Sequence, residues 1–404
     1  MINKRILAVI GAGFGDEGKG LAVDHFCSVG EGCLVVRHNG GAQAGHTVKS
    51  GEKRFVFHQL SSGSFRRADT YMAETFLPDL FKIEEEISGF AAVSGHIPVI
   101  FGNVGACITI IDDVLLNMAL ETSRGKNRHG SCGMGINEAV LRSEAGFGIT
   151  LGEVCGMSAE ALERRLSQIR REYVYPRLSA LGLDDAGEYS QLIRSARVTE
   201  NAAEGILRGA EYITPSYGLR ELAGGRERIV FEGAQGLLLD SENKRFSPHV
   251  TASRTGIRNP MDICRGSGLE LDTAVYVMRS YVTRHGAGPL PCECEPGELG
   301  EIVPDKTNVE NQWQGRLRYG FYESAEELAE RISGDLSDWK GRAELFITHL
   351  NETRGRVKFR NGDIPAQRLY RDKAFGGRID GGYLSYSEAE EPLASGSLPC
   401  RAAE

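Results

Sequence analysis

Short apolar runs, each followed by glycine or polar residues, recur along the chain. They lie at 6–10, 33–36, 97–101, 228–231 and 344–348. Runs of this length with a turn behind them are typical of β-strands. Because the apolar residues are continuous instead of alternating, both faces of each strand should be covered. The pattern therefore predicts a mostly parallel sheet.

Helical patterns lie between the predicted strands. The first, 18–27, follows the strand 6–10 and a glycine-rich turn, which gives the order strand, loop, helix. The longest runs from about 159–183, and another opens at Ser324 with Glu327 three residues later, a capping-box signature. We predict an α/β fold with a mostly parallel central sheet, helices on both faces, a P-loop-like nucleotide site and small insertions.

The chain shows neither an internal repeat nor a low-complexity linker. Residues 1–384 are therefore predicted to form a single domain. Residues 385–404 are rich in Ser, Glu, Pro and Ala and offer little to a hydrophobic core. We predict that this stretch is a loose C-terminal tail.

Composition narrows the choice of partners. The 404 residues carry a net charge of -8, which argues against a broad surface for nucleic acid or acidic membranes. The apolar segments are too short for a membrane span or a signal peptide, and nine cysteines without metal-site spacing fit a reducing compartment. We expect no nucleic acid and no membrane as partner, and a cytoplasmic location.

Residues 13–20, GFGDEGKG, contain the GxxxxGK part of a P-loop, directly after a strand and at the start of a helix. Backbone amides of such a loop can hold phosphate oxygens. Gly20 replaces the Ser or Thr that usually binds Mg²⁺, which argues against a P-loop kinase or GTPase, and Asp16 could bind the metal instead. A chance glycine-rich turn is the alternative, but carboxylates in a phosphate cradle are unfavourable without a metal or catalytic use.

Four blocks carry a resemblance to a known family. They are GDEGKG at 15–20, VVRHNGGAQAGHT at 35–47, FEGAQG followed by LD at 231–240, and YVTRHGAGP at 281–289. Together they resemble the adenylosuccinate synthetases, from residue 6 to about residue 355. The resemblance implies a ligase that joins L-aspartate to C6 of a purine mononucleotide, with nucleoside triphosphate cleavage and a 6-phosphoryl intermediate.

The resemblance implies roles for the first two blocks. Asp16 would take the proton from N1 of the purine, and His46 would stabilise the transferring phosphoryl group. Mg²⁺ is the implied cofactor, with Asp16 and Gly45 as its ligands. The implied contacts to the nucleoside triphosphate are Gly15, Glu17, Gly18, Lys19, Gly20, Gly45 and Thr47. Without the family, His46 in a glycine turn would suit a structural role equally well.

The other two substrates are also placed by the resemblance. The implied contacts to the purine mononucleotide are Asn39, Gln43, Ser131, Cys132, Gln235 and Thr251. Arg316 and Arg318, in GRLRYG, match the paired arginines that bind aspartate, since a guanidinium fork suits a carboxylate. For Gln235 the alternative is an amide that only stabilises a turn. For the two arginines the alternative is a solvated basic turn. The family also implies a homodimer in which an arginine reaches the partner's nucleotide, and Arg142 is nearest, although offset.

Several positions depart from the family. Its Lys-x-Asp element, which reads the guanine of GTP, corresponds to THLNE at 348–352, and residues 356–404 lack the segment that closes the base pocket. Because loss of a hydrogen-bonding partner can change discrimination by about 10⁴, we predict ATP, or a relaxed choice between ATP and GTP, as donor. Near the acceptor, Gln43 replaces an Asn, Met134 replaces an Arg, and 307–314 replaces a threonine-rich loop.

These differences look closer to the viral branch of the family, whose enzymes place aspartate on GMP or dGMP on the way to 2-aminoadenine. We therefore predict GMP or dGMP as acceptor, and the host cytoplasm as location if the chain is viral. Many enzymes of that branch have a smaller residue at the position of Asp16, so its presence keeps IMP as the alternative acceptor. A nucleotide-binding relative without turnover would be favoured by loss of Asp16 or His46, and both are present.

Overall fold

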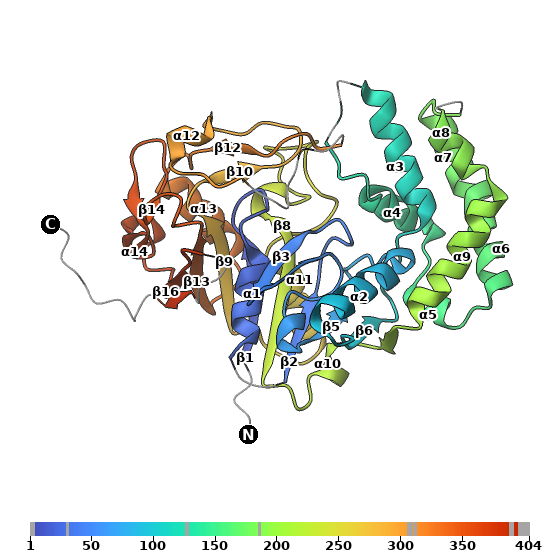
Figure 1. Cartoon of the computed structure of the whole chain (residues 1–404), viewed down its shortest axis with the longest axis horizontal. Helices are drawn as coiled ribbons and strands as arrows, with labels where there is room; N and C mark the ends of the chain where they lie inside the picture. The colour runs from blue at the N-terminus through green and yellow to red at the C-terminus, as the bar shows by residue number, and fades with distance from the viewer. Residues whose placement is uncertain are drawn as a thin grey trace.

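The computed structural model describes residues 5–29, 32–125, 128, 130–184, 187–304, 310, 313–387 and 392–394. A large sheet runs through the centre of the molecule (Figure 1). A group of helices lies beside one end of the sheet, and the C-terminal region of the described chain lies beside the other.

Ten strands form the central sheet in the described part of the chain. In spatial order they are β17 (Leu393–Ala394), β16 (Gly381–Leu384), β13 (Arg342–Thr348), β9 (Thr273–Arg279), β1 (Arg5–Gly11), β8 (Arg228–Gly236), β2 (Cys33–Arg37), β5 (Asp69–Met72), β6 (Ile100–Asn103) and β7 (Ile213–Ser216). Every neighbouring pair is parallel except β16 and β17, which are antiparallel. The prediction of an α/β fold with a mostly parallel sheet is confirmed.

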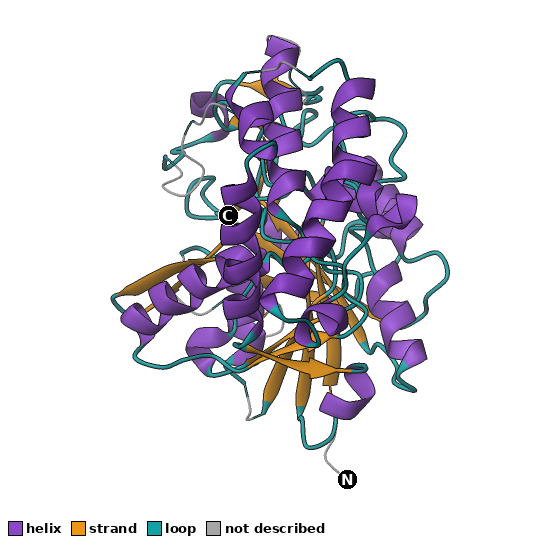
Figure 2. Ribbon diagram, turned by 90° about the vertical axis from the view of Figure 1, so that its right-hand side faces the viewer, coloured by secondary structure: helices purple, strands orange, loops and turns teal. Residues whose placement is uncertain are grey.

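Helices cover the sheet and build the helical part beside it (Figure 2). The longer ones are α1 (Lys19–Cys27), α2 (Leu80–Ser94), α3 (Ile111–Arg124), α6 (Ala159–Ile169), α9 (Ala196–Ala210), α11 (Arg258–Gly266) and α13 (Ala325–Asp335). The shorter ones are α4 (Ile136–Arg142), α5 (Leu151–Cys155), α7 (Tyr175–Ala180), α8 (Glu188–Ile193), α10 (Leu219–Leu222), α12 (Pro296–Leu299) and α14 (Ala366–Leu369). Among the described residues, no helix is long and apolar enough to cross a membrane.

Three small sheets are the predicted insertions. They are the hairpin of β3 (His46–Ser50) and β4 (Lys53–Phe57), the group of β10 (Val282–Arg284), β12 (Arg318–Gly320) and β11 (Glu293–Cys294), and the pair of β14 (Arg356–Val357) and β15 (Ile364–Pro365). The first of these begins at the predicted catalytic histidine, and the second contains one of the two predicted aspartate-binding arginines.

The central strands are buried on both faces, as the continuous apolar runs predicted. Successive side chains of a strand point to opposite faces. In β1, Leu7 and Val9 pack into the same apolar cluster as the side chains of α1, whereas Ala8 and Ile10 belong to the cluster that includes residues of α11 and α13. Helices therefore hold the carboxyl ends of the central strands in fixed positions.

The predicted strands correspond to β1, β2, β6, β8 and β13, with some errors. The run 97–101 was placed too early, because β6 begins at Ile100 and the side chain of Ile97 is 65% exposed. The sequence interpretation omitted β5 and β9. With only four residues, β5 is too short to give a clear pattern, while β9 (TAVYVMR) is buried throughout and carries the same signal as the strands that were predicted.

The predicted helices are also found. The long pattern at 159–183 becomes α6, a π-helical turn at Arg170–Val174, and α7. In that turn the guanidinium of Arg170 donates to the carboxylate of Asp112 at 2.7 Å, which ties α6 to α3. The hydroxyl of Ser324 accepts from the N–H of Glu327 at 3.1 Å, which confirms the predicted start of α13.

The C-terminal tail is only partly described. The N–H of Ser385 donates to the carbonyl of Ile347 at 2.8 Å, so backbone pairing with the central sheet continues one residue beyond the predicted boundary at 384. Leu393 and Ala394 form β17. The remaining parts of the predicted tail, 388–391 and 395–404, lie outside the described residues.

Candidate functional site

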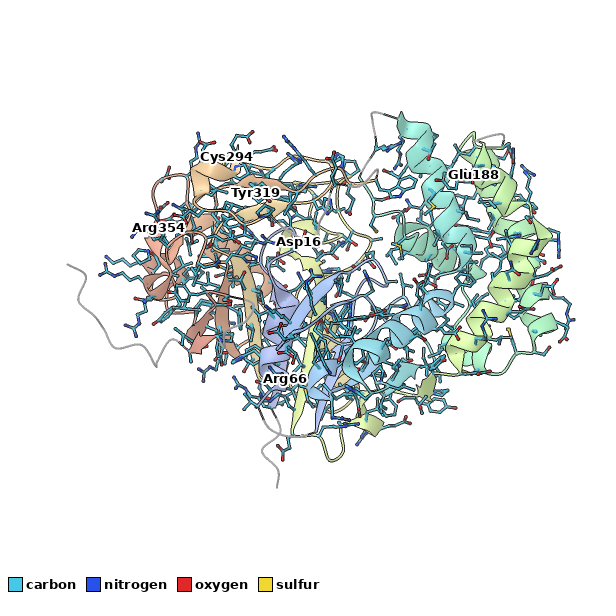
Figure 3. The ribbon with its side chains drawn as sticks, in the orientation of Figure 1. Asp16, Arg66, Glu188, Cys294, Tyr319 and Arg354 are labelled. Carbon is cyan, nitrogen blue, oxygen red and sulfur yellow. The ribbon has the colours of Figure 1, made fainter. Side chains whose placement is uncertain are left out.

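The predicted site residues gather at the carboxyl ends of the central strands. In parallel sheets this edge is where ligands bind, because the loops that follow the strands meet there. Asp16 follows β1. In Figure 3, Asp16 and Tyr319 of β12 lie toward one end of the central strands, and Arg66 lies toward the opposite end. Gln235 is at the end of β8, and the block at 38–47 follows β2.

The glycine loop is closed by one of its own carboxylates. Oε1 of Glu17 accepts from the N–H groups of Gly13 and Gly15 at 2.9 and 2.8 Å, and Oε2 lies 2.6 Å from Nζ of Lys19. The side chains of Glu17 and Lys19 are both buried. Glu17 thus shapes the first half of the loop in this structure, and the contact of Glu17 and Lys19 with a triphosphate stays a prediction.

Helix α1 begins at Lys19, so the N–H groups of its first turn have no partners within the helix. This helix end carries the partial positive charge that favours phosphate. Gly20 lies so close to the start of β3 that a Cβ there would be 3.1 Å from Cβ of His46 and 3.2 Å from the carbonyl oxygen of Thr47. The packing of α1 on β3 explains why neither Ser nor Thr follows the lysine.

Asp16 and Gln235 have left-handed backbone conformations, with φ angles of 61° and 62°. Non-glycine residues in this conformation store strain and often lie at functional sites. Nε of Arg279 donates to the carbonyl oxygen of Asp16 at 2.5 Å, which holds the backbone in place. Burial raises the pKa of the Asp16 carboxyl, and the charges of Arg279 and Lys19 oppose the increase.

Two amide side chains at the carboxyl edge of the sheet, one after β2 and one at the end of β8, carry polar atoms without a hydrogen-bond partner in the described structure. They are Oε1 of Gln235 and Nε2 of Gln43, and both are buried. Oε1 of Gln43 accepts from the N–H of Gly41 at 2.6 Å, which leaves its amide nitrogen as the free end. Because buried polar atoms are normally satisfied, these two atoms fit the predicted contacts to the purine mononucleotide.

Asn39 makes hydrogen bonds within the protein. Its Nδ2 donates to the carbonyl oxygen of Ala234 at 3.0 Å, and its Oδ1 accepts from the N–H of the same residue at 2.8 Å. The side chain is fully buried. Asn39 therefore joins the loop after β2 to the end of β8, and its contact with the purine nucleotide stays a prediction.

His46 is paired with a carboxylate that the sequence interpretation did not assign. Nδ1 of His46 lies 2.5 Å from Oε1 of Glu232, which also accepts from the hydroxyl of Ser62, while Oε2 of Glu232 accepts from the N–H of Ser62 at 3.1 Å. Burial lowers the pKa of His46, and Glu232 opposes the decrease. Burial alone would raise the pKa of Glu232, but Arg37 and His46 hold it at about 2. The FEGAQG block contained this residue, yet nothing in the sequence indicated its partner.

Ser131 and Cys132, predicted contacts to the purine mononucleotide, follow a glycine that lies close to the GAGP block, and Ser131 also contacts helix α3. Ser131 exchanges hydrogen bonds with the side chain of Asn117 at 3.0 and 3.1 Å. Gly130 is close to the GAGP block, since a Cβ there would be 2.4 Å from the nitrogen of Ala287. Cys132 is half-buried, and burial raises its pKa. The backbone N–H of Thr251 donates to the carbonyl of Leu239 at 2.8 Å, and Thr251 is half-buried.

Arg316 and Arg318 line a cavity of about 390 Å³ together with residues around β11. The guanidinium of Arg318 donates to Glu293 at 2.8 Å and to the carbonyl oxygen of Gly288 at 2.7 Å. Arg316 is exposed. Cys294 and Tyr319, labelled in Figure 3, lie near each other above the carboxyl ends of the strands. The two arginines are therefore on the same side of the sheet as Asp16, and Arg318 already has a carboxylate partner.

Arg142 does not fit the predicted role across a dimer. It is fully buried, and its guanidinium donates to both carboxylate oxygens of Asp113 at 2.9 Å and to the carbonyl oxygens of Phe147 and Ile108 at 2.8 Å. An arginine that holds α3 and α4 together in this way cannot reach a partner's nucleotide. The sequence left this arginine unplaced, with Arg142 only the nearest candidate, and the burial of Arg142 removes that candidate.

The element 348–352, where the family has its guanine reader, lies directly beside the glycine loop. The hydroxyl of Thr348 donates to the carbonyl oxygen of Glu17 at 2.8 Å. The hydroxyl of Tyr281 donates to Oε2 of the buried Glu352 at 2.5 Å, so this acid serves the structure. Asn351 is exposed.

The residues present fit a hard cation. The carboxylate of Asp16 and the carbonyl of Gly45 offer oxygen atoms, the ligand type that Mg²⁺ prefers. Because burial disfavours the ionised form of Asp16, a neighbouring cation would restore it. Within the described ranges no group of three or more His, Cys, Asp or Glu residues could hold a metal.

Comparison with known proteins was made at the level of sequence and of structure. The family model described as adenylosuccinate synthetase matches residues 8–325. The adenylosuccinate synthetase of Microcystis aeruginosa is 29% identical over 343 residues, which cover 81% of this chain and 71% of the relative. That of Gloeobacter violaceus is 30% identical over 339 residues, with 81% and 72% covered.

Two solved structures have the same fold. The fully ligated adenylosuccinate synthetase of Plasmodium falciparum superposes with a TM-score of 0.67 at 20% identity and covers 87% of this chain and 79% of its own. The succinoaminodeoxyadenylate synthetase of cyanophage S-2L, bound to dGMP and to dATP as an energy donor, superposes with a TM-score of 0.63 at 14% identity and covers 97% and 95%. Since the family model matches well over half of the sequence, the chain belongs to the adenylosuccinate synthetase family of carbon–nitrogen ligases.

Proposed function

We propose that the protein joins L-aspartate to C6 of GMP or dGMP with cleavage of ATP, which gives the N6-succinyl nucleotide for 2-aminoadenine synthesis. The observation that carries the donor assignment is the element 348–352 beside the glycine loop, where the Lys-x-Asp pair of the family is absent. The cyanophage enzyme, which binds dGMP and uses dATP as an energy donor, covers nearly the whole of this chain and supports the acceptor assignment.

In the proposed reaction Asp16 removes the proton from N1 of the purine, so that O6 becomes a nucleophile. O6 then attacks the γ-phosphorus, the bond from that phosphorus to the bridging oxygen breaks, and nucleoside diphosphate leaves. His46 stabilises charge on the transferring group. The amine of aspartate, held by Arg316 and Arg318, next attacks C6, loses a proton and displaces phosphate.

Mg²⁺, when bound at Asp16 and Gly45, would neutralise charge on the phosphate oxygens. We propose that Gln43 and Gln235 orient the purine mononucleotide, because their buried Nε2 and Oε1 atoms have no other partner in the described structure. Ser131, Cys132 and Thr251 are proposed contacts to the same nucleotide. The start of α1, with Gly15, Gly18, Gly20 and Thr47 nearby, is the proposed place of the triphosphate.

IMP is the second candidate acceptor, and the presence of Asp16 favours it. In that case the protein would be an adenylosuccinate synthetase with an altered donor site. A purine-nucleotide-binding protein without turnover is a weaker candidate, since Asp16 and His46 are both present and both adjoin the glycine loop. We also propose a homodimer, as the family implies, with a residue other than Arg142 reaching the partner's nucleotide.

The test is to incubate the protein with aspartate and Mg²⁺ while crossing GMP, dGMP and IMP against ATP and GTP. Mass spectrometry then identifies the succinylated nucleotide. We expect the succinyl derivative of GMP or dGMP, with higher kcat/KM for ATP than for GTP. Product from IMP alone would contradict the acceptor assignment, and a preference for GTP would contradict the donor assignment.

A further inference from the structure

Glu232 is a fully buried carboxylate that the proposed reaction does not use. An ionised carboxylate in the interior costs several kcal/mol unless charges and hydrogen bonds compensate. Here the compensation comes from Nδ1 of His46 at 2.5 Å, from the N–H and hydroxyl of Ser62, and from the charge of Arg37. The chain therefore places an acid behind the imidazole of its predicted catalytic histidine.

A purely structural acid holds the same neighbouring segment in another way. Glu86, in α2, accepts from the backbone N–H groups of residues 58–60 at distances of 2.7 to 3.1 Å and touches no catalytic side chain. The segment leading to Ser62 is thus anchored by Glu86. The additional contact of Glu232 with an imidazole needs a separate explanation.

The geometry at His46 supplies one. Nδ1 and Nε2 lie on opposite sides of the imidazole ring. The contact of Nδ1 with the carboxylate of Glu232 therefore directs Nε2 away from Glu232. His46 is the first residue of β3 and packs against the start of α1, because a Cβ at Gly20 would lie 3.1 Å from Cβ of His46. A carboxylate can only accept, so Nδ1 must carry the proton, and this selects the tautomer.

We propose that Glu232 is a positioning residue for His46, which fixes the orientation and the Nδ1-protonated state of the imidazole so that Nε2 faces the transferring phosphoryl group. The inference rests on the proposed catalytic role of His46. It assigns to Glu232 a task that resembles that of the acid in a catalytic triad, where the wrong tautomer costs about 10⁴-fold in rate. Ser62 holds the carboxylate itself in place.

The kinetic test compares Glu232→Gln with the matched control Glu86→Gln. Both changes replace a buried carboxyl next to segment 58–62 with an amide, but only the first replaces the carboxyl that faces Nδ1 of His46. We expect Glu232→Gln to lower kcat by about 10²-fold or more, by analogy with triad acids, with each substrate KM little changed, and Glu86→Gln to leave kcat near the wild-type value. Equal losses of kcat in the two variants, or an unchanged kcat in Glu232→Gln, would overturn the proposal.

A second readout uses ¹⁵N-histidine NMR of the full-length protein without substrates, with the signal of His46 assigned by comparison with His46→Ala. We expect protonated Nδ1 in the wild type and in Ser62→Ala, and a change toward the other tautomer in Glu232→Gln. A wild-type His46 protonated only at Nε2 would contradict the proposal without the need for any variant. A protein with the expected signal that ligates none of the tested nucleotides would instead contradict the proposed function.

Discussion

At the scale of single residues, the site combines two residues in strained backbone conformations with a glycine loop whose own charged side chains pair with each other. Asp16, in the loop after β1, and Gln235, at the end of the neighbouring β8, have positive φ angles, and Arg279 holds the backbone of Asp16. The pair of Glu17 and Lys19 neutralises the loop from within. Asp16 is the other acid of this loop, and its carboxylate is not part of the Glu17–Lys19 pair, which suits it to proton transfer.

Asp16→Asn tests this role. Asn has nearly the same shape and tolerates a positive φ, so the fold should persist. The amide cannot take the proton from N1, and we expect kcat to fall by about 10² to 10⁴-fold. The measurement is the steady-state rate alongside the thermal midpoint, and a variant that keeps more than a tenth of the wild-type kcat with unchanged stability would contradict the role of Asp16.

Motifs carried the predictions for single residues. Asp16 and His46 were identified from rare strings, and the structure places Asp16 within the glycine loop and His46 against Gly20. Pairings between distant segments could not be predicted, because they depend on strand order. Glu232 lies 186 positions from His46, and only the neighbouring places of β2 and β8 in the sheet bring their ends together.

At the scale of elements, the caps and buried acids of the helices set local stability. Asp79 is the N-cap of α2, where its carboxylate accepts from the N–H of Lys82 at 3.2 Å. Burial raises its pKa to about 6, although backbone hydrogen bonds oppose this. Since the pKa of Asp in the unfolded chain is about 3.9, the carboxyl of Asp79 binds its proton more tightly in the folded protein. Asp79 therefore lowers the free energy of unfolding as the pH rises from about 4 through 6.

Asp79→Asn should remove that pH dependence and keep the cap, because Asn is an equally good N-cap residue. We expect the free energy of unfolding of the wild type, relative to this variant, to fall by up to about 3 kcal/mol between pH 4 and pH 7. Urea unfolding at several pH values measures it. Asp79→Ala, which loses the cap, is the control and should be less stable than Asp79→Asn by about 1 kcal/mol. A pH-independent difference between the wild type and Asp79→Asn would contradict the assignment.

The elements themselves were largely predictable from patterns. Capping by Ser324 and the apolar run of β1 follow from local rules, and both are found. Errors occurred where local signals are weak, as in the four-residue β5, or where turn residues precede a strand, as at Ile97. The arginine that reaches the partner's nucleotide could not be placed from the sequence, because a sequence position does not reveal burial. The pairing of Arg142 with Asp113 depends on how α3 and α4 pack.

At the scale of the whole molecule, the strand order decides which segments form the site. The central position of β1, with β8 and β9 on either side, brings the glycine loop, the FEGAQG block and the segment that starts at Arg279 to one edge. The small sheet of β10, β12 and β11 lies above that edge, and the group of helices lies beside the central sheet (Figure 1). The fold thus brings together blocks that are far apart in the sequence and to which we assign the substrate contacts.

The central claim is that C6 is activated by phosphorylation of its oxygen before aspartate attacks. The most direct measurement follows ¹⁸O from the 6-position of the acceptor nucleotide during turnover with aspartate, ATP and Mg²⁺. Because the O6–phosphorus bond forms and the C6–O6 bond then breaks, we predict that the inorganic phosphate released carries the ¹⁸O label, as mass spectrometry would show. Release of unlabelled phosphate with formation of the succinyl nucleotide would contradict the account.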